Sequence, residues 1–407
     1  MKKKSALLVI FVTVFIDLIG FGMIIPLSPY LAREFDASDF QVGLLMSIYS
    51  LMQFFFAPMW GRISDYKGRK PIILLSLVGA GLAHIMFAFA SSYWGLFLAR
   101  TLAGFFGANI ATAMAYVADV TDEGNRSKQM GLIGAAFGLG FIFGPFFGAE
   151  LARFGEYMGD MPPFGSSFAA IGAGSICLLN AVFAFFVLEE SLIGQVAKKK
   201  TLMVHERVKL LFKYIKKPVV GVLLQTTFVV TFSMALMEAT LFLFVQDLFD
   251  WELRKAGYGF AYVGIIMVST QGYLIRKWMP KFGEKKLLIA GAILLGLGLM
   301  GIALSDTVAV LAVAVTSLGV GTGLLNPSIV GSISLLSDKT EQGMSIGVNQ
   351  SFSALGRIIG PAVGGWFYQV YGLRSPFWLA TATSVIALLM LLLIFKNLPD
   401  KGKAQEE

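Results

Sequence analysis

The sequence is poor in the residues that disulfides, metal sites and catalytic centres require. Its 407 residues include one cysteine, Cys177, and two histidines. An intrachain disulfide is therefore excluded, and no zinc site with the usual Cys/His spacing can be built. Neither a Ser/His/Asp set nor a glycine-rich phosphate loop stands out. We expect no enzyme, no metal and no cofactor, and the missing nucleotide site argues against an ATP-driven protein.

Charge is also scarce, which separates this chain from soluble proteins. Charged residues make up 14% of the sequence, whereas a typical soluble domain has about 25%. Hydrophobic residues make up 56% and the mean hydropathy is +0.74. This composition is typical of a protein that crosses a membrane many times.

Twelve apolar runs have about the 20 residues that a helix needs to cross a bilayer. Helices are expected, because an apolar segment in lipid must satisfy its own backbone hydrogen bonds. The first run lacks a small-residue cleavage pattern, so we interpret it as a retained membrane helix. The predicted spans are 6–30, 40–60, 71–90, 94–117, 128–151, 167–188, 218–246, 256–275, 285–304, 307–335, 343–370 and 374–396.

The basic residues predict the orientation of these spans. Of the 33 Lys and Arg residues, 26 fall in segments on the side of the N-terminus and 5 on the opposite side. Basic loops are enriched on the cytoplasmic side, so both termini are expected in the cytoplasm. The same asymmetry explains the net charge of +8 without nucleic acid as a partner.

An internal repeat predicts two halves. Shifting the chain by about 216 residues aligns Gly140, Gly144, Pro145 and Gly148 with glycines and a proline of the second half. We expect an all-α fold of two pseudosymmetric six-helix bundles, 1–188 and 218–407 with its short cytoplasmic tail. The intervening 189–217 is a cytoplasmic linker. Its 202–215 portion is either an interfacial helix or a solvated segment made basic by topology.

Three motifs identify a family. The stretch "GRISDYKGRK" (61–70) resembles the loop motif of the major facilitator superfamily. The stretches "LARTLAGFFG" around Arg100 and "GLGFIFGPFFG" (138–148) resemble motifs of its drug:proton antiporter branch, near the tetracycline efflux pumps. The pumps' intramembrane acid of helix three is replaced by Ala83. The resemblance therefore implies drug export in general rather than export of tetracycline itself.

The resemblance assigns roles to two of these motifs. It implies that Asp65 is part of a latch between the halves that closes the cytoplasmic side, and a conformational gate made of Gly61, Asp65, Gly68, Arg69 and Lys70 is the prediction. The alternative explanation is topology alone, because basic loops are expected on the cytoplasmic side. The antiporter-motif residues Gly140, Gly144, Pro145 and Gly148 are expected to pack helices closely, with a proline kink, against the other half.

Charged residues inside the spans are the candidate coupling groups. Asp17 lies in the middle of the first span, where a charge costs at least about 2.5–3.5 kcal/mol. It needs a cavity, a partner or a proton, and Arg100 is the candidate partner. Surroundings that alternate would let Asp17 load and release a proton; a fixed Asp17–Arg100 pair with a structural role is the alternative. Glu238 is a second candidate carrier.

Polar residues within the spans are candidates for a substrate cavity, or else they link helices. These are Gln53, Asn109, Gln225, Asn326, Asn349 and Arg357. The predicted function is a proton-coupled antiporter that exports small amphipathic compounds or drugs by alternating access, energised by the proton gradient. A uniporter or proton symporter for a small metabolite is the alternative, because the fold is the same. We expect a monomer in contact with membrane lipid, in a bacterial inner membrane.

Overall fold

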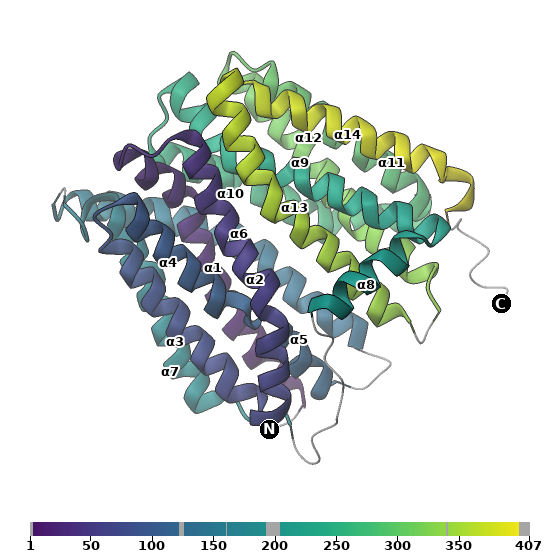
Figure 1. Ribbon diagram of the computed structural model, residues 1–407, viewed down its shortest axis with the longest axis horizontal. Coiled ribbons are helices and arrows are strands. Elements are labelled where there is room, and N and C mark those ends of the chain that lie inside the picture. Colours follow the sequence, from purple (N-terminus) through teal and green to yellow (C-terminus); the bar gives the residue numbers. More distant parts are fainter. Residues whose placement is uncertain (1–2, 122–125, 160, 193–203, 339–340, 399–407) are drawn as a thin grey trace. The chain divides into compact units, whose positions relative to one another are not determined.

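A computed structural model of the chain describes residues 3–121, 126–159, 161–192, 204–338 and 341–398. Every regular element in these ranges is a helix (Figure 1), which confirms the predicted all-α fold class. The residues form two compact units.

Unit 1 consists of Met1–Ser38, Ile48–Met203 and Trp251–Tyr262. Its α1 packs against α6 and α7, and its α3 packs against α4 and α7. The elements of this part of the chain are α1 (Lys3–Glu34), α2 (Asp39–Lys67), α3 (Arg69–Ala88), α4 (Tyr93–Phe106), the 3-10 turn η1 (Gly107–Asn109), α5 (Ile110–Asp119), α6 (Arg126–Glu156), the 3-10 turn η3 (Gly165–Ser167) and α7 (Phe168–Val187).

Unit 2 consists of Asp39–Ser47, Val204–Asp250 and Val263–Glu407. Its α9 packs against α13 and α14, and its α11 packs against α12 and α14. The elements are α8 (Val204–Ile215), α9 (Pro218–Phe249), α10 (Leu253–Ser269), the π-turn η4 (Thr270–Leu274), α11 (Ile275–Ala303), α12 (Val308–Leu335), α13 (Gln342–Tyr371), α14 (Ser375–Leu393) and the 3-10 turn η5 (Phe395–Asn397). The pairing repeats that of unit 1, as the internal repeat predicts.

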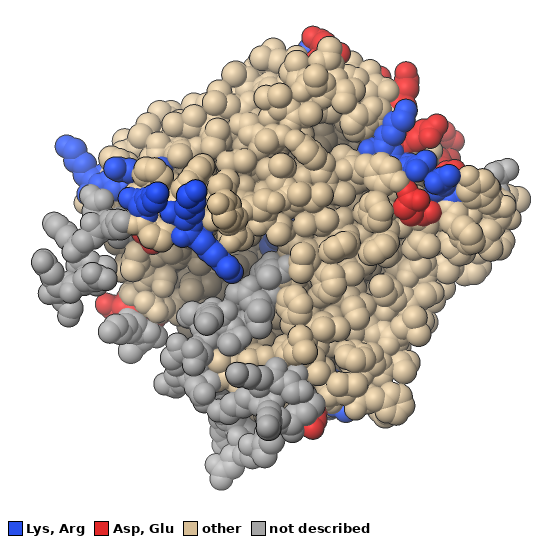
Figure 2. All heavy atoms as spheres, turned by 180° about the vertical axis from the view of Figure 1, so that it is seen from behind, with Lys and Arg blue, Asp and Glu red and all other residues tan. Residues whose placement is uncertain are grey.

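All twelve predicted spans lie on helices. Nine stretches within the described residues are long and apolar enough to cross a membrane, and the longest, Leu253–Ala303, contains two predicted spans. The remaining two spans lie on α6 and α13. Large apolar side chains lie on the surface of these helices, such as Phe186 and Leu393, which are 77% and 82% exposed. On the face in Figure 2, charged side chains gather in small clusters that are separated by wide uncharged surface.

Two charged stretches that the predicted spans leave as loops, 61–70 and 276–284, are mostly helical. We expected an aqueous turn over 61–70, but α2 continues to Lys67 and α3 begins at Arg69. Only Gly68 separates them, with φ at 100°. In the second half the predicted loop 276–284 is largely helical, with a kink at Gly283, where φ is 73°. Charged residues are solvated as well on a helix as in a loop, so the break needs only a glycine with positive φ.

Candidate functional site

Asp17 lies in α1 and contacts two groups from other helices of unit 1. Its Oδ1 is 3.9 Å from Sγ of Cys177 in α7, and its carboxylate also accepts a hydrogen bond from the side chain of Asn109. Asn109 reaches it from a break between α4 and α5, where Ala108 has a ψ of 17° instead of a helical value. Such 3-10 interruptions within a long helix often mark functional hinges. The break therefore places a polar group opposite the Asp17 carboxylate.

Arg100 lies in α4 and is 1% exposed. Its guanidinium carbon is 4.7 Å from the ring centroid of Tyr49 in α2 and 5.8 Å from that of Phe21 in α1. Within the described residues it forms no ion pair with Asp17. The fixed Asp17–Arg100 pair that the sequence allowed is therefore not formed, because each side chain is engaged by different neighbours.

Gln53 connects these groups. Its Nε2 donates to the hydroxyl of Tyr49 at 3.0 Å and to the carbonyl oxygen of Gly107 at 2.9 Å. The ring of Tyr49 in turn stacks on Phe21, with centroids 4.6 Å apart. Phe21 is one turn along α1 from Asp17. The structure thus brings together Asp17, Arg100, Gln53 and Asn109, four of the predicted residues, in the core of unit 1.

The predicted residues of unit 2 form a looser group. Glu238 in α9 and Arg357 in α13 are close enough for their charges to interact, and Arg357 is exposed. Oδ1 of Asn349 accepts a hydrogen bond of 2.6 Å from the hydroxyl of Thr227, which links α9 to α13. Gln225 is half-buried and Asn326 is exposed.

The antiporter-motif glycines pack within unit 1. A Cβ added at Gly140 would lie 2.7 Å from Cβ of Leu18, and one added at Gly144 would lie 2.6 Å from Cα of Gly22. Gly148 faces Met23 in the same way. These glycines therefore bring α6 against α1, which is the close helix packing expected of small residues.

The repeat mates behave alike in unit 2. Gly356 and Gly360 of α13 face backbone atoms of Phe228 and Phe232 in α9, at 3.0 and 2.8 Å from an added Cβ. The residues that the two halves share therefore have the same task. In each half they allow the proline-containing helix, α6 or α13, to lie directly on the first long helix of its unit, α1 or α9.

α6 and α13 each contact the first turns of a helix from the other half of the sequence. The sequence did not reveal these contacts. In unit 1, Gly257 of α10 lies against Pro145 and Ala149, and the hydroxyl of Tyr258 bonds to Glu150. In unit 2, the first turns of α2 lie on α13, with the N–H of Phe40 donating to Gln369 at 3.2 Å and the hydroxyl of Ser47 accepting from the N–H of Ala362 at 3.2 Å.

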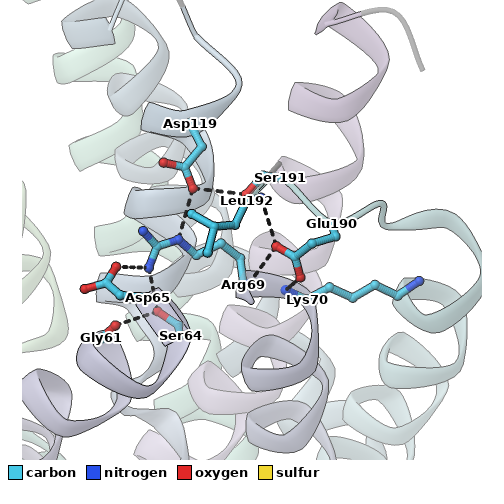
Figure 3. Close-up of polar contacts among 9 residues, drawn as sticks. All are labelled: Gly61, Ser64, Asp65, Arg69, Lys70, Asp119, Glu190, Ser191 and Leu192. Atoms are coloured by element: carbon cyan, nitrogen blue, oxygen red, sulfur yellow. Dashed lines mark hydrogen bonds and ion pairs between the residues drawn. The ribbon is translucent and has the colours of Figure 1, made fainter. Parts of the chain in front are cut away.

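The predicted gate residues form a compact charge cluster where α2 meets α3 (Figure 3). Nη1 of Arg69 is 2.5 Å from Oδ1 of Asp65 and donates to Oγ of Ser64 at 2.7 Å. Nε of Arg69 is 3.0 Å from Oδ2 of Asp119 at the end of α5. Asp65 therefore shares its cation with a second carboxylate.

Glu190 completes this cluster from the segment after α7. Its carboxylate accepts the backbone N–H groups of Arg69 at 2.8 Å and Lys70 at 3.1 Å (Figure 3). It thereby caps the first turn of α3, where backbone donors have no helical partner. Its Oε2 occupies the space of a Cβ at Gly68, while Gly61 has nothing within 4 Å of an added Cβ among the described residues. Lys70 Nζ donates to the carbonyl of Phe185 at 2.7 Å.

Sequence reasoning missed Asp119 and Glu190. Each is an acidic residue two positions beyond the end of a predicted span, close in sequence to other charged residues. That position was the available signal, but it is also what a solvated loop would show. Their contact with the 61–70 stretch depends on helix packing.

Comparison with known proteins decides the family. The sequence model of the Major Facilitator Superfamily matches residues 10–282 and 272–407. The chain belongs to the Major Facilitator Superfamily. Proteins of this superfamily are transporters, so the chain is an integral, multi-pass membrane transporter of small molecules and not an enzyme.

Relatives and solved structures agree with this family. The tetracycline resistance protein of class C from Escherichia coli is 31% identical over 395 residues, which are 96% of each chain. Multidrug resistance protein 2 of Bacillus subtilis is 30% identical, covering 95% of this major facilitator chain and 94% of its own. The crystal structure of a bacterial homologue of the human lysosomal transporter Spinster superposes with a TM-score of 0.78 at 15% identity, over 97% of each chain, which shows the shared fold.

Proposed function

We propose that this transporter is a proton-coupled antiporter that exports small amphipathic compounds or drugs by alternating access. The proton gradient across a bacterial inner membrane supplies the energy, and both termini lie in the cytoplasm. The protein works as a monomer. Relatives named for tetracycline and multidrug resistance match almost the entire chain and support export of drug-like compounds.

The observation that carries the proposal is the setting of Asp17. Its carboxylate lies within a membrane span and contacts an amide and a thiol instead of a cation. A carboxylate charge in such a place is costly, and binding a proton removes the charge. Asp17 therefore works as a proton carrier whose occupancy depends on which side of the membrane reaches it. Glu238, whose charge Arg357 offsets, is the second carrier candidate.

The first turns of α2 and α10 support alternating access, because each belongs to a different unit from the rest of its helix. α2 and α10 each contribute residues to both units, so a change of conformation requires their first turns to change contacts. The Arg69 cluster lies where α2 ends and α3 begins, and it supports a latch at that place. Because Arg69 holds Asp65 and Asp119 together, the cluster fixes the shape of that end, and its opening would accompany transport.

The experiment that tests the proposal uses everted membrane vesicles with ethidium as a fluorescent probe. Vesicles that contain the protein should accumulate ethidium when a proton gradient is imposed, and a proton ionophore should abolish accumulation. Vesicles without the protein provide the baseline. Accumulation that is unchanged by the ionophore would favour a passive carrier and contradict proton coupling.

A further inference from the structure

The guanidinium of Arg100 has hydrogen-bond donors without acceptors. Its Nε and Nη1 are both buried and have no hydrogen-bond partner among the described residues. Buried polar atoms are nearly always paired, and a buried charge without a partner is strongly destabilising. An exception of this kind calls for an acceptor.

The side chain is nevertheless held firmly in place. The rings of Tyr49 and Phe21 lie near the guanidinium, and Gln53 fixes Tyr49 through its hydroxyl. Gly104 lets α4 approach α2, since a Cβ there would lie 2.6 Å from the carbonyl oxygen of Tyr49. The aromatic rings attract the cation but accept no N–H bond from its edge. The N–H edge of Arg100 is therefore positioned in advance for an acceptor.

Among the described residues of unit 1, no carboxylate is bonded to Nε or Nη1 of Arg100. Asp17, a carboxylate of the same unit, is engaged by Asn109 and Cys177. His84 lies close enough to interact with the charge of Arg100, but an imidazole cannot supply a negative charge. A ligand with an anionic group can supply the acceptor.

We propose that Arg100 is the binding site for the anionic group of a transported compound, and that this group is a carboxylate on an aromatic ring. A carboxylate matches the planar fork of arginine and accepts parallel hydrogen bonds from it. Phe21 and Gln53 are only partly buried, so the ring of the ligand stacks on Phe21 at the accessible edge. This inference rests on the proposed transport function and names a substrate class for it.

The test is a binding measurement with two probes that differ only in charge, 1-naphthoate and 1-naphthamide. Equilibrium dialysis with the purified full-length protein in lipid nanodiscs gives both affinities. The wild type should bind naphthoate at least about tenfold more tightly than naphthamide, since a charge-assisted bidentate contact favours the anion by at least that factor. Arg100→Gln should bind both equally, while Arg153→Gln, which removes an exposed arginine of the same unit, should keep the wild-type preference.

Arg100→Lys keeps the charge without the planar fork, and it decides the question if Arg100→Gln does not fold. It should lose several-fold in naphthoate affinity and leave naphthamide unaffected. Equal affinity of the wild type for both probes, any preference for naphthoate in Arg100→Gln, or a preference of wild-type size in Arg100→Lys would overturn the proposal. Accumulation of 1-naphthoate in everted vesicles under an imposed proton gradient reports separately on transport. Transport with no naphthoate preference removes only the anion site, and a preference without transport removes only the proposed function.

Discussion

The carboxylate of Glu190 accepts a hydrogen bond from the backbone N–H of Arg69, 2.8 Å away. The contact joins the segment after α7 to the first turn of α3. It also stands beside the ion pair of Arg69 with Asp119. One short segment therefore receives restraints through both its backbone and its side chain.

Removing this cap should weaken unit 1. Glu190→Ala should lower the free energy of unfolding by about 1 kcal/mol, the usual size of a lost helix cap, because the N–H groups of Arg69 and Lys70 lose their acceptor. Glu156→Ala, at an exposed position of the same unit, is the control. Denaturant unfolding in detergent measures the difference. Equal loss in the two variants would show that the cap contributes nothing of its own.

The two glycines of the 61–70 motif should respond in opposite directions. Gly68→Ala should destabilise the protein by about 1–3 kcal/mol, because its φ of 100° and ψ of 157° suit essentially glycine alone. Gly61→Ala should be neutral or stabilising by up to about 1 kcal/mol, because Gly61 lies inside helix α2 with open space around it. Thermal unfolding of the two purified variants compares them. Similar melting shifts would contradict the different backbone roles.

These two glycines show what the sequence could predict. The spacing of the apolar runs was sufficient for the helical class and the positions of the spans, because lipid imposes helices of defined length. The motif identified Gly61 and Gly68 but could not separate their roles. That distinction depends on the φ angle of Gly68 and on the position of Glu190, which lies in the segment after α7.

The coupling residues show the same limit. The sequence could place Asp17 and Arg100 inside spans, because a charge within an apolar run is visible. It suggested that they could pair, since it shows no helix faces and no break at Ala108. Packing instead puts Asn109 beside Asp17 and Tyr49 beside Arg100.

The packing of the proline-containing helices predicts a matched pair of defects. Gly144→Ala on α6 and Gly360→Ala on α13 should each destabilise the protein by about 1–3 kcal/mol, the usual cost of overpacking, because the added methyl group meets backbone atoms of α1 or α9. Gly347→Ala on α13, where nothing lies within 4 Å among the described residues, should be tolerated. Thermal unfolding of the three variants gives the test. Tolerance of both crowded substitutions would refute the close packing.

The attachment of α8 should depend on acid. Glu341 accepts hydrogen bonds from Lys217 at 2.7 Å and from the hydroxyl of Tyr214. The hydrogen bond from Lys217 and its positive charge hold the pKa of Glu341 below its ordinary value of 4.5. At a pH well above the lowered pKa, Glu341 is charged and holds both Lys217 and Tyr214. These contacts weaken as the pH falls through the lowered pKa.

Amide hydrogen exchange of residues 210–217 measures this loss. Protection factors should be constant at neutral pH and should fall below about pH 4.5, the ordinary carboxyl range. In Glu341→Gln they should be lower at neutral pH and independent of pH over the same range. Protection in the wild type that equals protection in Glu341→Gln at neutral pH would show that Glu341 does not hold α8.

The most direct test of the account concerns proton movement through Asp17. Purified protein in proteoliposomes with a pH-sensitive dye in the lumen should show proton flux when an ethidium gradient is imposed. Asp17→Asn should abolish this flux, because an amide cannot carry the proton, while Glu238→Gln shows whether the second acid contributes. Proton flux at the wild-type rate in Asp17→Asn would contradict the central claim that this carboxylate couples transport to the proton gradient.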